Sequence, residues 1–92
     1  MTEKELESKL VKAVKARGGI AYKFTSPAHR SVPDRLVVMP GGRVIFIEVK
    51  APGKGRLTRL QQRERDRLES LEAEYYLLNS PDQIEEIIHG GA

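Results

Sequence analysis

Val32-Pro-Asp-Arg-Leu-Val-Val-Met39, Pro40-Gly-Gly42 and Arg43-Val-Ile-Phe-Ile-Glu-Val-Lys50 form the stretch that decides the fold of this chain. Two runs rich in β-branched residues flank a Pro-Gly-Gly turn, which is a pattern typical of a β-hairpin. Glycine supplies the backbone angles that such a tight reversal requires. The stretch therefore predicts two antiparallel strands joined at residues 40–42.

The length of the connecting loop decides which side chains share a face of this hairpin. With a three-residue loop the ladder closes at Met39, and Asp34 then lies directly opposite Glu48, on the same face as Lys50. A two-residue loop would shift the register by one residue and put the two carboxylates on opposite faces. We favour the longer loop because Pro40 has no N–H to donate to a ladder.

Two carboxylates held together beside an apolar sheet repel each other and lose hydration, so they require a cation. Lys50 could neutralise one of them. A hard divalent ion with oxygen ligands, Mg²⁺ or Mn²⁺, would neutralise both Asp34 and Glu48. A surface cluster of salt bridges is the alternative interpretation, because a Glu-X-Lys motif is too short to decide the matter alone.

The composition indicates one soluble globular domain over residues 1–92, with 32% charged and 39% hydrophobic residues. The chain has no cysteine, which excludes disulfides, thiolate zinc sites and cysteine nucleophiles. No apolar run approaches membrane-spanning length, and the N-terminus lacks the apolar core of a signal peptide, so we expect no membrane partner and a cytoplasmic location. A chain this short makes a homodimer plausible.

Basic residues are concentrated in one part of the chain. The net charge is only +3, but no acid lies between Glu48 and Glu64. An anionic partner is indicated, most commonly a phosphodiester backbone, although solvated surface charge is the alternative for any single arginine. The basic residues in this segment are Lys50, Lys54, Arg56, Arg59 and Arg63.

The remaining elements are predicted from periodicity and capping patterns. Apolar residues on both faces of the hairpin indicate a sheet that is covered on both sides. A strand reached from the hairpin through a helix should run parallel to it. The fold class is therefore α/β, a small mixed sheet flanked by helices in the order α-β-β-β-α-β-α, with helices over 2–17, 58–73 and from 80 onward, and outer strands over 20–24 and 74–79.

Two polar residues stand out on the predicted helices. Glu7 falls inside the apolar arc of the first helix, so it should have a partner or a metal, although an acid at the edge of the stripe is the alternative. Gln61 stands three residues after Thr58, where a capping box places it, and capping alone would explain it.

These motifs together resemble the VRR-NUC branch of the PD-(D/E)XK nuclease superfamily, in particular its stand-alone members of viral or prophage type. The resemblance covers nearly the whole chain and implies a restriction-endonuclease-like fold. Ser31 departs from the glycine often found before Val-Pro-Asp. The residues that carry the resemblance are Glu7, Val32-Pro-Asp-Arg35, Ile47-Glu-Val-Lys-Ala-Pro-Gly53, Gly55-Arg-Leu-Thr58 and Gln61.

The resemblance also implies roles for individual residues. Asp34 and Glu48 would bind the metal, with the carbonyl of Val49 as a further ligand. Lys50 would lie beside the attacking water, with Gln61 close by. A helix acid would complete or orient the site, and the spacing to Gly18 favours Glu7 over Glu3, because it is similar to that of archaeal Holliday-junction resolvases, which are dimers of the same fold.

We therefore expect a metal-dependent, structure-selective DNA endonuclease that acts as a homodimer, with Holliday junctions or other branched DNA as candidate substrates. The alternative is a nucleic-acid-binding module without catalysis, in which the acidic cluster only forms salt bridges. In either case, backbone phosphates rather than bases should be contacted. The predicted contacts are Lys23, Arg30, Lys54, Arg56 and Arg59.

Overall fold

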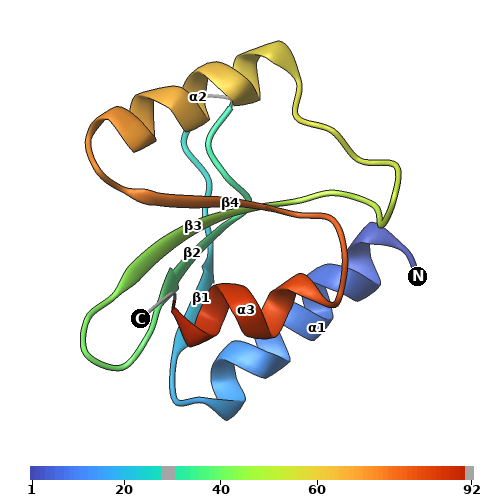
Figure 1. The fold of residues 1–92 in the computed structure, drawn as a ribbon, viewed down its shortest axis with the longest axis vertical. Coiled ribbons are helices and arrows are strands. Elements are labelled where there is room, and N and C mark those ends of the chain that lie inside the picture. The colour runs from blue at the N-terminus through green and yellow to red at the C-terminus, as the bar shows by residue number, and fades with distance from the viewer. Residues whose placement is uncertain (28–30, 91–92) are drawn as a thin grey trace.

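The computed structural model describes residues 1–27 and 31–90 and has the predicted order of elements (Figure 1). Three helices and four strands alternate along the chain as α-β-β-β-α-β-α, so the predicted α/β class is confirmed. The elements are α1 (Glu3–Ala16), β1 (Ile20–Lys23), β2 (Arg35–Val38), β3 (Val44–Val49), α2 (Arg59–Ser70), β4 (Glu74–Leu78) and α3 (Gln83–His89).

The four strands form one mixed sheet in the order β1-β2-β3-β4. Strands β1, β2 and β3 are antiparallel neighbours, and β4 runs parallel to β3, as the helical crossover predicted. At the turn, the Met39 N–H donates to the Arg43 carbonyl at 2.8 Å, and Arg35 pairs with Ile47. The three-residue loop and its register are therefore confirmed.

One face of the sheet forms the hydrophobic core against α1 and α3, which lie together below the sheet in Figure 1. Helix α1 begins with the predicted capping box, in which Thr2 and Glu5 exchange side-chain and backbone hydrogen bonds. Leu6, Leu10 and Val14 of its apolar stripe are completely buried, and Ala13 is partly buried. The core residues are Leu6, Leu10, Val14, Val37, Met39, Ile45, Ile47, Val49, Leu78, Ile84, Ile87 and Ile88.

Helices lie on both faces of the sheet, but the second face is only partly covered, so the prediction of two covered faces holds only in part. Helix α2 lies above the sheet and packs on β4, and the β1 side of this face is open. Ile20, Tyr22 and Val44 are 52%, 54% and 43% exposed. The helical spacing of Leu60, Leu68 and Leu71 predicts a buried stripe on α2, but only Leu68 is half-buried, and the other two are exposed.

The start of α3 also differs from the prediction. The helix begins at Gln83 and not directly after Ser80. Ser80 and Gln83 have the spacing of a capping box, but only half of it is formed. Gln83 Oε1 accepts the Ser80 N–H at 3.2 Å, whereas the Ser80 hydroxyl accepts the Asp82 N–H. Within the described ranges, no helix is long and apolar enough to cross a membrane.

Candidate active site

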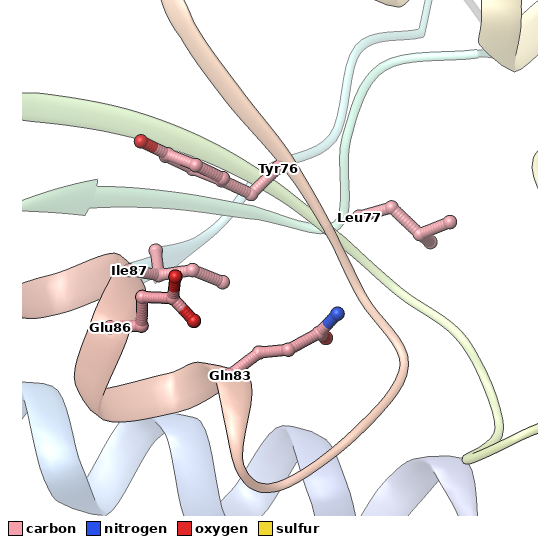
Figure 2. A pocket seen from close by; sticks show the side chains of 5 residues that line it. All are labelled: Tyr76, Leu77, Gln83, Glu86 and Ile87. Atoms are coloured by element: carbon pink, nitrogen blue, oxygen red, sulfur yellow. The ribbon is translucent and has the colours of Figure 1, made fainter. Parts of the chain in front are cut away.

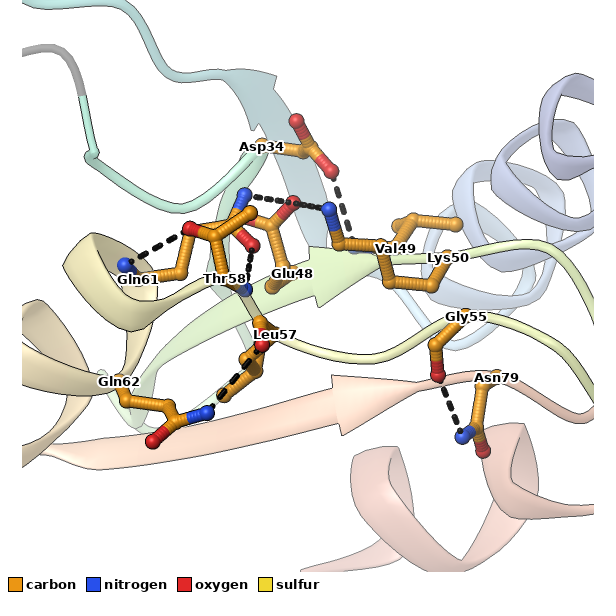
Figure 3. Close-up of polar contacts among 10 residues, drawn as sticks. All are labelled: Asp34, Glu48, Val49, Lys50, Gly55, Leu57, Thr58, Gln61, Gln62 and Asn79. Atoms are coloured by element: carbon orange, nitrogen blue, oxygen red, sulfur yellow. Dashed lines mark hydrogen bonds and ion pairs between the residues drawn. The ribbon is translucent and has the colours of Figure 1, made fainter.

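The open end of the β2–β3 hairpin brings the predicted carboxylates together (Figure 3). Asp34 immediately precedes β2, and the observed register places it opposite Glu48, near the end of β3. Asp34 Oδ2 accepts the backbone N–H of Val49 at 2.9 Å. This hydrogen bond fixes the Asp34 carboxylate beside the Glu48 carboxylate, on the face of the sheet that lies under α2.

Glu48 is an acid in a position that disfavours its charge. Its residue is 3% exposed, and burial, followed by the negative charge of Asp34, raises the pKa of Glu48 to about 8. Lys50 opposes this rise in pKa, and Glu3 adds a little to it. Glu48 Oε1 is buried without a hydrogen-bond partner among the described residues.

The other oxygen of Glu48 has two partners. Gln61 Nε2 donates to Glu48 Oε2 at 3.2 Å, and Lys50 Nζ lies 3.8 Å from the same atom. Gln61 Oε1 accepts the Thr58 N–H at 2.9 Å, so one side chain caps α2 and contacts the site. The cap holds the amide in place, which directs its NH₂ group toward Glu48.

Lys50 is held by the loop that follows it. Gly55 packs so closely that a Cβ at this position would lie 2.0 Å from the Cβ of Lys50. The loop is tied down on both sides, because the Gly55 N–H donates to the Ala51 carbonyl at 3.0 Å and the Gly55 carbonyl accepts from Asn79 at 3.4 Å (Figure 3). A glycine is therefore required here to let the loop cover Lys50.

The predicted helix acid, Glu7, has an ion pair of its own. Its Oε2 lies 2.7 Å from Arg35 Nε, and Arg35 also donates to the Ala21 carbonyl at 3.1 Å. Over residues 1–27 and 31–90, no group of three or more His, Cys, Asp or Glu side chains is placed to hold a metal. The structure thus does not gather Glu7 with Asp34 and Glu48 in such a group. It links Glu7 to the residue after Asp34.

Two further residues interact electrostatically with Glu48. Glu3, which the sequence comparison set aside in favour of Glu7, is the acid of α1 whose charge contributes to the raised pKa of Glu48. It lies three and seven residues before Leu6 and Leu10, on the side of the helix that carries the buried stripe. The second residue was missed by the sequence reasoning. Tyr75, which is buried on β4, has its pKa raised by burial and then by the charge of Glu48, and only the parallel register reveals this proximity.

The predicted DNA contacts lie on two sides of the carboxylates. Lys54, Arg56 and Arg59 are exposed on the loop after β3 and at the start of α2. Lys23 is exposed on β1, where it pairs with Arg35. Lys23 and Arg35 line a groove of about 380 Å³ with Lys4, Glu7, Ser8 and Val11. Arg30 lies outside the described residues.

A separate pocket of about 300 Å³ lies between β4 and α3 (Figure 2). Its lining contains none of the predicted site residues. Side chains of α3 face Tyr76, which points to the core face of the sheet, whereas Asp34 and Glu48 lie on the other face. This pocket is therefore distinct from the carboxylate site, and its lining residues are Tyr76, Leu77, Gln83, Glu86 and Ile87.

The donor set at the hairpin end fits a hard divalent cation. Two carboxylates lie beside each other at the end of an apolar sheet, and a buried oxygen of Glu48 lacks a partner among the described residues. A cation between Asp34 and Glu48 would favour the ionised form of both and satisfy that oxygen. Carboxylate and carbonyl oxygens are ligands that Mg²⁺ and Mn²⁺ accept.

Comparison with known proteins gives two close likenesses. Over 80 residues the chain is 50% identical to "Putative nuclease p44" of Acyrthosiphon pisum secondary endosymbiont phage 1, covering 87% of this chain and 85% of that protein. A solved structure described as a VRR_NUC domain superposes with a TM-score of 0.91 at 25% identity, covering 100% of both chains. No protein-family model matches the chain.

Proposed function

The chain belongs to the VRR-NUC family as a stand-alone member, and we propose that residues 1–92 form one metal-dependent endonuclease domain of the PD-(D/E)XK type, acting on DNA. One observation carries the proposal: Glu48 is buried opposite Asp34 with an oxygen that has no partner among the described residues. A cluster of salt bridges would satisfy that oxygen, so the observation favours a catalytic site over a passive one.

Asp34, Glu48 and the Val49 carbonyl would hold Mg²⁺ or Mn²⁺. Such an ion, when bound, polarises a phosphodiester and lowers the pKa of water. Since a cation favours carboxylates in their ionised form, its binding would release the proton that Glu48 holds near neutral pH.

The neighbouring side chains have positioning and proton-transfer roles in this proposal. Lys50 either deprotonates the attacking water as a neutral amine, or orients it as an ammonium group that also offsets the negative charge developing on the phosphate. Gln61 fixes the orientation of the Glu48 carboxylate through its hydrogen bond to Oε2. Glu7 orients the site indirectly, because it holds Arg35, the residue that follows Asp34.

DNA would be bound through its phosphates on both sides of the carboxylates. Lys54, Arg56 and Arg59 would contact the backbone on the α2 side, and Lys23 would do so at the groove beside α1. Arg30 is proposed to join these contacts. Contacts of this kind read the shape of DNA more than its sequence, which favours branched substrates, Holliday junctions among them.

A second copy of the chain is proposed to cover the open face of the sheet. Two cross-strand rows on this face consist only of apolar and aromatic side chains, and the row after them contains Asp34 and Glu48. An exposed, uncharged patch of this kind is typical of a protein interface and unsuited to phosphate. A two-fold dimer would present two sites to opposing strands of a four-way junction. The rows are Ile20–Val38–Val44 and Tyr22–Leu36–Phe46.

Light scattering tests the dimer directly. The wild-type chain should have the mass of two copies, and Tyr22→Glu should reduce it to one, because a charge would be buried at the interface. Leu71→Glu is the matched control, since Leu71, just after the end of α2, is 72% exposed and lies outside the two rows. A wild-type chain that stays monomeric at high concentration would contradict the dimer.

Cleavage of a labelled four-way junction and a matched linear duplex, with Mg²⁺, Mn²⁺ or EDTA, tests the enzyme proposal. The wild type should cut the junction only with metal. Lys50→Ala should bind the junction but cut it about 100-fold more slowly, which is the usual scale for loss of one catalytic group. Lys12→Ala, on the exposed side of α1, should cut normally.

Two outcomes would contradict parts of this proposal. If the wild type binds DNA with metal present and never cuts it, the chain is a binding module without catalysis. Asp34→Asn should lose cleavage yet bind DNA at least as tightly, because repulsion of phosphate is reduced. Normal cutting by this variant would show that Asp34 is not a metal ligand.

A further inference from the structure

The backbone groups of β3 alternate between its two neighbouring strands. In an antiparallel pair, opposite residues either exchange both backbone hydrogen bonds or exchange none, in strict alternation. Met39 is bonded to Arg43, so the rungs of the β2–β3 ladder join odd-numbered residues, the last of them Arg35 with Ile47. The Lys50 N–H donates to Leu78 on the other side, which is consistent with this alternation.

The next hydrogen-bonded pair of the ladder would be Pro33 and Val49, but these two residues do not exchange the usual backbone hydrogen bonds. In a regular ladder, the N–H of residue 33 would donate to the Val49 carbonyl. Proline has no N–H, so this donor does not exist. The Val49 N–H, which would normally donate to the carbonyl of residue 33, donates to Asp34 Oδ2 instead.

The Val49 carbonyl oxygen consequently points toward β2, where the ladder has ended. No hydrogen bond to this oxygen is found among residues 1–27 and 31–90. Because the N–H and C=O of one strand residue project to the same side, the oxygen lies on the side where Asp34 Oδ2 is held. Pro33 itself is fully buried, so its ring is fixed in the fold.

We propose that Pro33 is a positioning residue that keeps the Val49 carbonyl oxygen free to bind the divalent cation, an inference that rests on the proposed metal-dependent function. A residue with an N–H at this position would complete the rung. Its N–H would then compete with the cation for the carbonyl oxygen. Pro33 thus acts through the absence of a backbone N–H, which leaves the Val49 carbonyl oxygen without a competing donor.

Mn²⁺ binding to the full chain without DNA tests this inference, with free Mn²⁺ measured by electron paramagnetic resonance. Pro33→Ala introduces an N–H and should weaken Mn²⁺ binding about 10-fold, the scale on which altered partners of metal ligands act. The new amide should be protected from hydrogen exchange, because it is bonded to Val49.

A second variant separates the missing donor from the packing of the ring. The 92-residue chain is within reach of chemical synthesis, so N-methylalanine can be placed at position 33. This residue also has no N–H, and it should bind Mn²⁺ as the wild type does.

Two results would overturn the inference while leaving the proposed function intact. One is equal Mn²⁺ affinity of Pro33→Ala and the wild type. The other is equally weak binding by the alanine and N-methylalanine chains, which would assign the effect to packing. A wild-type chain that does not bind Mn²⁺ would overturn the metal-dependent function, and this inference with it.

Discussion

The two ends of the β2–β3 hairpin have opposite chemistry, although they belong to the same pair of strands. At the turn, Met39 bonds to Arg43 and accepts from Gly42, so the backbone groups are used by the fold. At the open end, regular pairing stops at Arg35, and Val49 donates to a carboxylate. Where the fold leaves polar groups unused, they become available to a ligand.

The largest expected effect is at the open end, with Glu48→Gln. The amide keeps the shape of the side chain and removes a charged ligand, so cleavage should fall about 1,000-fold, at the upper end for loss of one electrostatic group. Single-turnover cleavage of the labelled junction measures this effect. Cleavage by Glu48→Gln within tenfold of the wild-type rate would contradict a catalytic role for the open end of the hairpin.

A smaller loss is expected from Gly55→Ala. The added Cβ would lie 2.0 Å from the Cβ of Lys50, so the loop or Lys50 must move, and cleavage should fall about 100-fold. Gly53→Ala is the control in the same loop, because its φ of 75° strains the alanine backbone while no atom lies within 4 Å of the added Cβ. It therefore reports loop strain without a contact to Lys50. Equal activity of the two variants would show that the contact between Gly55 and Lys50 does not position the lysine.

The pH dependence of metal binding tests the electrostatics of the open end. Since the pKa of Glu48 is raised to about 8 without metal, Mn²⁺ binding must displace a proton below that pH. Affinity should therefore increase about tenfold per pH unit between pH 6 and pH 7.5 and level off above pH 8. Calorimetry in buffers of different ionisation enthalpy counts the released proton, and no release at pH 6.5 would contradict the raised pKa.

The same raised pKa predicts how stability depends on pH in EDTA. The folded-state pKa of Glu48 lies above its ordinary value of 4.5, so its contribution to stability is complete below pH 4.5 and is lost as pH rises through 8. The slope for one proton is at most about 1.4 kcal/mol per pH unit. Urea unfolding of the wild type and Glu48→Gln should show this loss in the wild type alone.

The smallest effect is expected at the turn, from Gly42→Ala. Gly42 has a φ of 86°, where alanine is strained, and its added Cβ would meet nothing within 4 Å. The free energy of unfolding should fall by about 1 kcal/mol. Cleavage per folded molecule should be unchanged, and a loss of more than tenfold would show that the two ends are not functionally separate.

Much of the hairpin could be predicted because its determinants are local. Pro40 and the two glycines after it specify the loop, and the loop fixes the register that places Asp34 opposite Glu48. The capping boxes at Thr2 and Thr58 are likewise each determined by four consecutive residues. Interactions of this range leave a readable pattern in a single sequence.

What could not be predicted depends on contacts between distant segments. The partner of Glu7 is Arg35, 28 residues away, and no helical period reveals that pair. The inward face of α2 carries Gln61, the buried Glu64 and the half-buried Leu68. A rule that buries leucines identifies only the last of these and wrongly adds Leu60. The unpaired carbonyl of Val49 could be recognised only after the structure showed which residues of the β2–β3 ladder exchange backbone hydrogen bonds.

A crystal of the chain soaked in Mn²⁺ would test the central claim most directly, through its anomalous-difference map. We predict a peak at the open end of the hairpin, bonded to carboxylate oxygens of Asp34 and Glu48 and to the Val49 carbonyl oxygen, at roughly 2.0–2.3 Å. A fully soaked crystal with no peak there, or a peak held by Glu7 and other acids without Glu48, would contradict the claim.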